Sequence, residues 1–135
     1  GTAMLRSAVD AAKTGKNPLQ LLGVTVLTSL SSADMAELGI ADTAEHHAER
    51  LAVLGAGAGL SGFVCSAHEI ARLRKVLPQN AILVVPGIRP KGAPLQDQTR
   101  VMTPDDAFTA GADYLVIGRP ITQDSDPLAA AKACF

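Results

Sequence analysis

The sequence predicts an α/β fold in which parallel strands alternate with helices. Four short apolar runs read as buried strands, and no hairpin signal joins any two of them. Helix start and stop signals lie between the runs. Apolar residues make up 47% of the chain but aromatic residues only 3%, so the core must be built from small aliphatic side chains. Such a core is typical of parallel strands covered by helices.

The elements follow one another in a regular order. The first helix is predicted over residues 4–12, where apolar residues recur on one face and Gly15 follows as a stop signal. The predicted strands are the apolar runs at residues 21–27, 62–65, 81–85 and 113–117. A short helix over residues 33–38 ends at Gly39. Thr43 can cap a longer helix, whose predicted inner face is Ala44, Ala48, Leu51 and Leu54.

The later helices carry clear capping signals. Ser66 and Glu69 have the spacing of a capping box, which predicts a helix that continues to Leu77. The run 103–106 combines a hydroxyl cap, a proline in the first turn and two acids near the positive end of the helix dipole. That helix is expected to end at Gly111, and a last one to begin at Asp126-Pro127.

Parallel strands joined by helices demand right-handed crossovers, which leaves an open sheet or part of a barrel. An open sheet fits poorly, because the opening helix has no strand before it. A (β/α)8 barrel takes about 250 residues, whereas this chain has 135. Half a barrel would leave two free edges if it stood alone. We therefore expect residues 1–135 to form one segment, the second half (strands five to eight) of a (β/α)8 barrel whose first half is not present.

Two loops predict a phosphate site. Residues 86–90 (PGIRP) and 118–122 (GRPIT) each follow a predicted strand and place glycine and arginine where the strand ends. Glycine lets backbone N–H groups approach a ligand closely, and arginine presents a planar fork of donors that matches phosphate oxygens. In (β/α)8 enzymes the loops after strands seven and eight often hold a phosphate. We expect Arg89, Gly118 and Arg119 to bind one here.

Two further side chains are candidates for ligand binding. Gln98 lies in a polar loop from Pro86 to Met102, which is long for a strand-to-helix connection. Thr28 comes directly after the first predicted strand, so its hydroxyl should face the mouth of the barrel. Plainer interpretations stay open, because Gln98 can be an ordinary loop residue and Thr28 a helix cap. Arg89 and Arg119 can instead pair with carboxylates such as Asp97 or Asp113.

Other classes of site find little support. A net charge of −1 does not favour nucleic acid or a membrane surface as partner. His46 and His47 are adjacent and point to different helix faces, so we expect no metal site. Cys65 and Cys134 are expected to be free thiols of a reducing cytosol, and no histidine is placed to activate Cys65 as a nucleophile.

The motifs in their order resemble those of the bacterial orotidine 5′-phosphate decarboxylase family, over essentially the whole chain. The matching stretches are VTVLTS (24–29), VCSA (64–67), PGIRP (86–90), DQTRVMTP (97–104) and GADYLVIGRPIT (111–122). The resemblance implies a (β/α)8 barrel of the ribulose-phosphate-binding type that works as a cytoplasmic homodimer with a shared active site. It also implies conversion of orotidine 5′-monophosphate to uridine 5′-monophosphate (UMP) and CO2, the last step of de novo pyrimidine synthesis, without metal or organic cofactor.

The resemblance also implies roles for the candidate residues. Thr28 should meet the pyrimidine-ribose end of the ligand, and Gln98 should bridge phosphate and base. Arg89 should lie at the phosphate side of the pocket. Gly118 should give a backbone N–H to the phosphate, and Arg119 its guanidinium.

One departure from the family pattern limits the expected activity. The catalytic motif of the family, Asp-x-Lys-x-x-Asp, occurs nowhere in this sequence. We therefore expect no catalytic residue in the chain, which would supply the phosphate- and nucleotide-binding half and be inactive alone. Two alternatives remain: another phosphosugar barrel enzyme, such as a hexulose-phosphate synthase, and a non-catalytic half-barrel that dimerises through its open edges and only binds phosphates.

Overall fold

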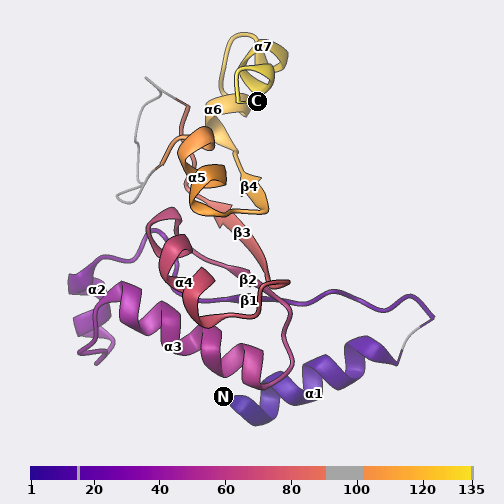
Figure 1. Cartoon of the computed structure of the whole chain (residues 1–135). Helices are drawn as coiled ribbons and strands as arrows, with labels where there is room; N and C mark the ends of the chain where they lie inside the picture. Colours follow the sequence, from indigo (N-terminus) through magenta and orange to yellow (C-terminus); the bar gives the residue numbers. More distant parts are fainter. Residues whose placement is uncertain (15, 91–101, 135) are drawn as a thin grey trace.

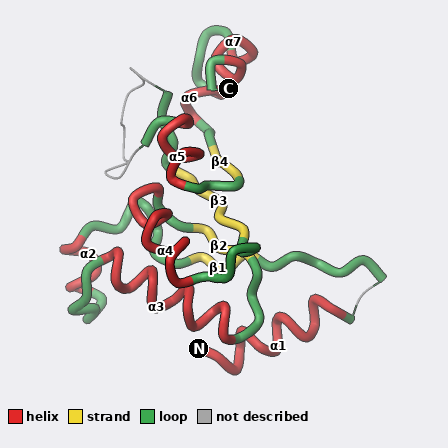
Figure 2. The backbone as a smooth tube through the Cα atoms, in the orientation of Figure 1, coloured by secondary structure: helices red, strands yellow, loops and turns green. Residues whose placement is uncertain are grey.

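A four-stranded parallel sheet forms the centre of the fold in a computed structural model, which describes residues 1–14, 16–90 and 102–134 (Figure 2). The strands are β1 (Leu22–Val24), β2 (Gly62–Val64), β3 (Ile82–Pro86) and β4 (Tyr114–Val116). They lie side by side in chain order, and each pair of neighbours is parallel. The predicted α/β architecture with parallel strands is confirmed.

Helices connect the strands and cover one face of the sheet (Figure 1). The longer helices are α1 (Thr2–Lys13), α3 (Ala44–Gly57), α4 (Ile70–Val76) and α5 (Pro104–Ala110). The shorter ones are α2 (Ser32–Glu37), the 3-10 helix η1 (Ala67–Glu69), α6 (Arg119–Thr122) and α7 (Pro127–Lys132). A sheet in chain order with right-handed crossovers places its connecting helices on the same side, as a barrel requires.

The core lies between this face of the sheet and helices α3, α4 and α5. Phe63 of β2 and Leu83 of β3 are almost fully buried there, against Ile70 and Leu73 of α4. Ala107 brings α5 onto the same cluster. A second, smaller cluster holds the start of α3 against α2 and consists of Val26, Met35, Ala44 and Ala48.

The helix signals read from the sequence are confirmed. The Thr43 hydroxyl accepts a hydrogen bond from the N–H of His46 and begins α3. The Ser66–Glu69 capping box forms in both directions, although it opens a 3-10 turn before α4 rather than α4 itself. Gly111 ends α5 with a φ of 109°, a left-handed conformation that a side chain would strain.

Two predicted details are wrong. The first strand is Leu22–Val24 and so shorter than residues 21–27. The N–H of Thr25 makes the last hydrogen bond to β2, with the Thr25 hydroxyl on the same Val64 carbonyl, and Val26 then packs into the smaller cluster. The inner face of α3 includes Ala52 and Gly55, whereas Leu54 is 40% exposed. Gly55 lies directly against β2, since a Cβ on it would be 2.8 Å from the Phe63 ring.

The opposite face of the sheet is apolar and exposed. Val24, Val64, Val84 and Tyr114 are register partners across the four strands, so their side chains share this face. Tyr114 is 60% exposed and Val24 is 56% exposed. A shallow depression of about 350 Å³ lies on it, lined by Gln20, Leu22, Ile82, Val84 and Tyr114. In a complete barrel, this side of the strands would face the interior.

Candidate functional site

The loop after β3 holds Arg89 in a buried position. Gly87 turns the chain with a φ of 75°, and the N–H of Arg89 then donates to the Met102 carbonyl at 3.0 Å. Ile88 and Met102 form a parallel bridge, which fixes the base of the loop. Arg89 is only 7% exposed. Its Nη1 donates to the Ile88 carbonyl at 2.9 Å, but its Nε has no hydrogen-bond partner among the described residues.

A buried donor without a partner is a costly feature. Leaving such a group unsatisfied costs about 1–3 kcal/mol, and more where the group is charged. The Arg89 guanidinium therefore presents an unused donor at the end of β3. An acceptor oxygen from a ligand would satisfy it, and a phosphate oxygen would also supply the opposite charge.

The loop after β4 turns directly into a short helix. Gly118 is the N-cap of α6, and its carbonyl accepts hydrogen bonds from the N–H groups of Ile121 and Thr122. Arg119 is the first residue of α6 and is partly buried. A Cβ built on Gly118 would have no atom within 4 Å, so the space beside its backbone is open among the described residues.

These two loops lie at the same edge of the sheet. Pro86 and Val116 are register partners at the ends of parallel strands β3 and β4, so Arg89 and Gly118 follow the same ends of neighbouring strands. Thr28 is half-buried in the turn after β1, which ends at that edge too. Gln98 lies outside the described residues. The fold therefore gathers four of the five candidates at the carboxyl ends of the strands.

Cys65 follows β2 at this edge, but its thiol is buried and unreactive. The residue is 1% exposed, and burial raises the pKa of its thiol to about 12, with the charge of Glu69 adding to the shift. Glu69 is itself fully buried and accepts from the N–H of Ser66 at 2.9 Å. A thiol held neutral in this way is a packing group and not a nucleophile. Both cysteines are free and buried, as predicted.

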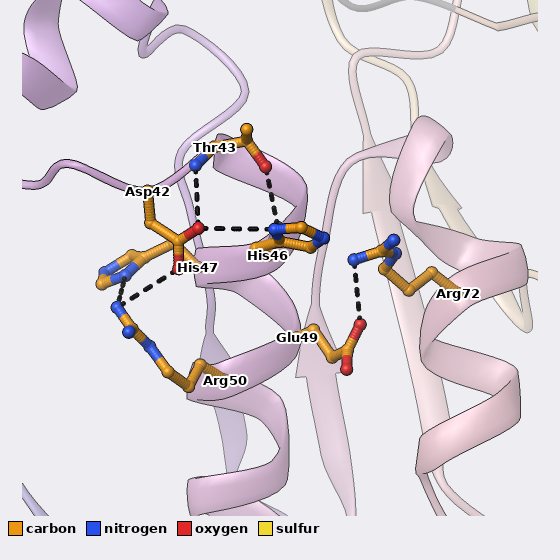
Figure 3. Close-up of polar contacts among 7 residues, drawn as sticks. All are labelled: Asp42, Thr43, His46, His47, Glu49, Arg50 and Arg72. Atoms are coloured by element: carbon orange, nitrogen blue, oxygen red, sulfur yellow. Dashed lines mark hydrogen bonds and ion pairs between the residues drawn. The ribbon is translucent and has the colours of Figure 1, made fainter.

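The histidines of α3 belong to a polar network on the surface (Figure 3). Asp42 lies 3.5 Å from His46 Nδ1 and 3.5 Å from the Arg50 guanidinium, which also contacts His47 Nδ1 at 2.9 Å. Within residues 1–14, 16–90 and 102–134, no group of three or more potential ligand side chains is arranged to hold a metal ion. In the same ranges, no helix is long and apolar enough to cross a bilayer.

One residue pair escaped the sequence reasoning. Asp113, considered there as a partner for Arg89 or Arg119, instead contacts Arg74 of α4 at 2.6 Å. The two residues are 39 positions apart, and Arg74 carries no motif, so no local pattern could have joined them. This pair lies at the amino ends of β3 and β4, opposite the candidate site.

Comparison with known proteins gives consistent results. Residues 1–134 match a family model described as orotidine 5′-phosphate decarboxylase / HUMPS family. Curated proteins named orotidine 5′-phosphate decarboxylase are 48% identical over 134 residues in Enterobacter sp. (strain 638) and 52% identical over 128 residues in Pectobacterium atrosepticum. These alignments cover 98% and 94% of this chain, but 54% and 52% of the two relatives.

A solved structure gives the same result for the fold. The crystal structure of orotidine 5′-phosphate decarboxylase from Lactobacillus acidophilus superposes with a TM-score of 0.80 at 32% identity. The match covers 99% of this chain and 57% of that protein. The chain thus spans about half the length of the relatives it matches, and its parallel sheet corresponds to part of their barrel.

Proposed function

Because this chain belongs to the orotidine 5′-phosphate decarboxylase / HUMPS family, we propose that it supplies the phosphate- and nucleotide-binding half of an orotidine 5′-monophosphate decarboxylase. The reaction releases CO2 and leaves UMP, the last step of de novo pyrimidine synthesis. The family description covers two kinds of enzyme, and the curated relatives at 48% and 52% identity favour the decarboxylase over a hexulose-phosphate synthase.

The proposed architecture is a barrel completed by four further strand-helix units. The exposed apolar face of the sheet supports this proposal, because large side chains such as Val24 and Tyr114 would be covered by the other half. The catalytic Asp-x-Lys-x-x-Asp motif that the sequence lacks would lie in that half. The 135-residue chain by itself is then inactive, and the complete enzyme is a cytoplasmic homodimer.

The observation that carries the proposal is the buried Nε of Arg89, which has no partner among the described residues and lies at the same sheet edge as Gly118. A phosphate held there would accept from the Arg89 and Arg119 guanidiniums and from the Gly118 N–H. Thr28 would contact the pyrimidine-ribose end, and Gln98 would bridge phosphate and base. Binding energy from the phosphate, remote from the bond that breaks, would serve to organise the reacting end.

A reconstituted barrel tests this proposal. It joins the half of the Pectobacterium atrosepticum relative that this chain does not cover to residues 1–135 of this chain. We expect it to convert orotidine 5′-monophosphate to UMP, followed by liquid chromatography, whereas the 135-residue chain alone releases none. A folded reconstituted barrel that forms no UMP would contradict the proposed function.

Removing the phosphate contacts tests the site within that barrel. Arg119→Ala should raise KM for orotidine 5′-monophosphate by about 10- to 100-fold, the equivalent of a charge-assisted hydrogen bond of about 1.5–3 kcal/mol. Orotidine, which lacks the phosphate, should be a far poorer substrate. An unchanged KM would remove Arg119 from the site, and equal turnover of the two substrates would reject the phosphate-binding role of both loops.

A further inference from the structure

The guanidinium of Arg74 ties together the starts of β3 and β4. Its Nη1 donates to the Ala81 carbonyl at 2.6 Å, directly before β3. Its Nε and Nη2 both donate to the Gly111 carbonyl, at 2.9 and 2.7 Å, in the turn before β4. Nη2 also contacts Asp113 at 2.6 Å. One side chain of α4 therefore holds the two turns from which the strands begin.

Asp113 adds a rung to the β3–β4 ladder. Its N–H donates to the Leu83 carbonyl at 3.0 Å, and its carboxylate accepts from the N–H of Leu83 at 2.7 Å. Both backbone groups of Leu83 are thus satisfied by one residue, immediately before the first register pair, Val84 and Tyr114. The same carboxylate oxygen also accepts from Arg74 Nη2, so the carboxylate's hydrogen bonds to Arg74 and to the N–H of Leu83 are charge-assisted.

The shape of the turn before β4 is adapted to Arg74. Gly111 has a φ of 109°, and a Cβ on it would lie 3.3 Å from Arg74 Nε and 3.4 Å from Arg74 Cγ. The absence of a side chain lets the guanidinium approach the Gly111 carbonyl closely. The guanidinium therefore packs directly against the turn. Arg74 and Asp113 are called the strand clamp below.

The strand clamp matters because β4 is short and lies at the edge of the described sheet. β4 has three residues and pairs with β3 on one side. Tyr114 and Val116, which project from its uncovered face, are 60% and 50% exposed. Directional hydrogen bonds fix how far one strand is displaced along its neighbour. The clamp adds hydrogen bonds from Arg74 and to Asp113 to those of the β3–β4 backbone ladder, so it helps to fix the position of β4 along β3.

We propose that the strand clamp positions the two phosphate-binding loops relative to each other, with Arg74 and Asp113 acting as positioning residues for Arg89 and Gly118. The inference rests on the proposed function. Arg89 lies three residues beyond β3 and Gly118 two residues beyond β4, so each strand transmits the placement of its start to its loop. A strand advances about 3.3 Å per residue, so the clamp acts on the loops from roughly 15–20 Å away.

The test compares two arginines of the same helix. Arg74→Met removes the donors of the clamp and keeps an apolar stem. Arg72→Met is the matched control, because Arg72 pairs with Glu49 at 3.1 Å and so links α4 to α3 (Figure 3). Both variants are made in the reconstituted barrel, and kcat and KM are measured for orotidine 5′-monophosphate and for orotidine, below the melting temperature of each variant.

A positioning role and a structural role give different results. We expect Arg74→Met to lower kcat/KM for orotidine 5′-monophosphate at least 10-fold, mainly through KM, and to change that for orotidine by less than about 2-fold. Arg72→Met should change neither. An equal loss for both substrates would mean that Arg74 only stabilises the fold, and this outcome, or no loss at all, overturns the proposal.

Two further measurements keep the proposal testable. If Arg74→Met does not fold, Asp113→Asn replaces it. The amide oxygen of asparagine can still accept from the N–H of Leu83 but lacks the charge that pairs with Arg74. The same selective loss is expected.

An inactive wild-type barrel would contradict the proposed function alone. The clamp would then be judged by the affinity of the 135-residue chain for inorganic phosphate, which Arg74→Met should lower at least 10-fold.

Discussion

Two glycines allow the same small change to be made with opposite consequences. Gly118 has a φ of −102°, outside the left-handed region, and no described atom lies within 4 Å of where its Cβ would be. Gly111 has a φ of 109°, and a Cβ there would crowd Arg74. Replacing each by alanine in the reconstituted barrel separates the needs of the fold from the needs of the ligand.

The magnitudes follow from these geometries. Alanine at a left-handed position costs about 1–3 kcal/mol, and for a barrel of about 250 residues about 1 kcal/mol lowers the melting temperature by about 2–4 °C. Gly111→Ala should therefore lower it by about 2–12 °C. Gly118→Ala should lower it less than Gly111→Ala does, because a Cβ on Gly118 would meet no described atom within 4 Å.

Ligand binding gives the decisive contrast at Gly118. A methyl group beside the Gly118 N–H would keep a phosphate from approaching, and the lost charge-assisted hydrogen bond is worth about 1.5–3 kcal/mol. Isothermal titration calorimetry with UMP should show a Kd about 10- to 100-fold higher. A Gly118→Ala variant that melts like the wild type and binds UMP equally well would refute the role given to this loop.

Three other outcomes are expected. Arg89→Met should raise the melting temperature in the absence of phosphate, because it removes a buried unsatisfied donor that costs about 1–3 kcal/mol; an equal or lower temperature would contradict the cost assigned to Nε. Thr103→Ala removes the hydroxyl that accepts from the N–H of Asp106 and should cost about 1 kcal/mol in thermal unfolding, and no loss would mean that the cap is redundant. Cys65 should resist iodoacetamide at pH 8 until urea unfolds the chain. Because burial raises the pKa of Cys65 from 9.0 to about 12, the folded state keeps a proton that the unfolded state loses, so this contribution to stability is complete below about pH 9 and is lost as the pH rises towards 12; rapid labelling of the folded chain would contradict it.

Local signals determined most of the helices. The hydroxyl caps at Thr43, Ser66 and Thr103 and the stop at Gly111 act within four residues of where they lie, so the sequence predicts them directly. The parallel order of the strands also followed, because no hairpin signal joins them. The ends of the strands were harder to predict. β1 ends just before Thr25, whose hydroxyl donates to the carbonyl of Val64, a residue 39 positions away.

The candidate site was predictable in part for the same reason. Glycine and arginine at the ends of two successive strands predict a ligand-binding site at that edge of the sheet. The structure places Arg89 and Gly118 at this edge. The burial of Arg89 and its unused Nε depend on tertiary packing, so no local sequence pattern predicts them. The contact of Arg74 with Asp113 likewise depends on two distant turns, so only the folded chain reveals it.

The central claim is that the turns after β3 and β4 hold the phosphate of the nucleotide together. A crystal structure of the reconstituted barrel with UMP tests it most directly. We expect phosphate oxygens within hydrogen-bond distance of the Gly118 N–H and of the Arg89 and Arg119 guanidiniums. UMP bound with its phosphate at any other part of the barrel, and with Arg89 Nε still without a partner, would contradict the claim.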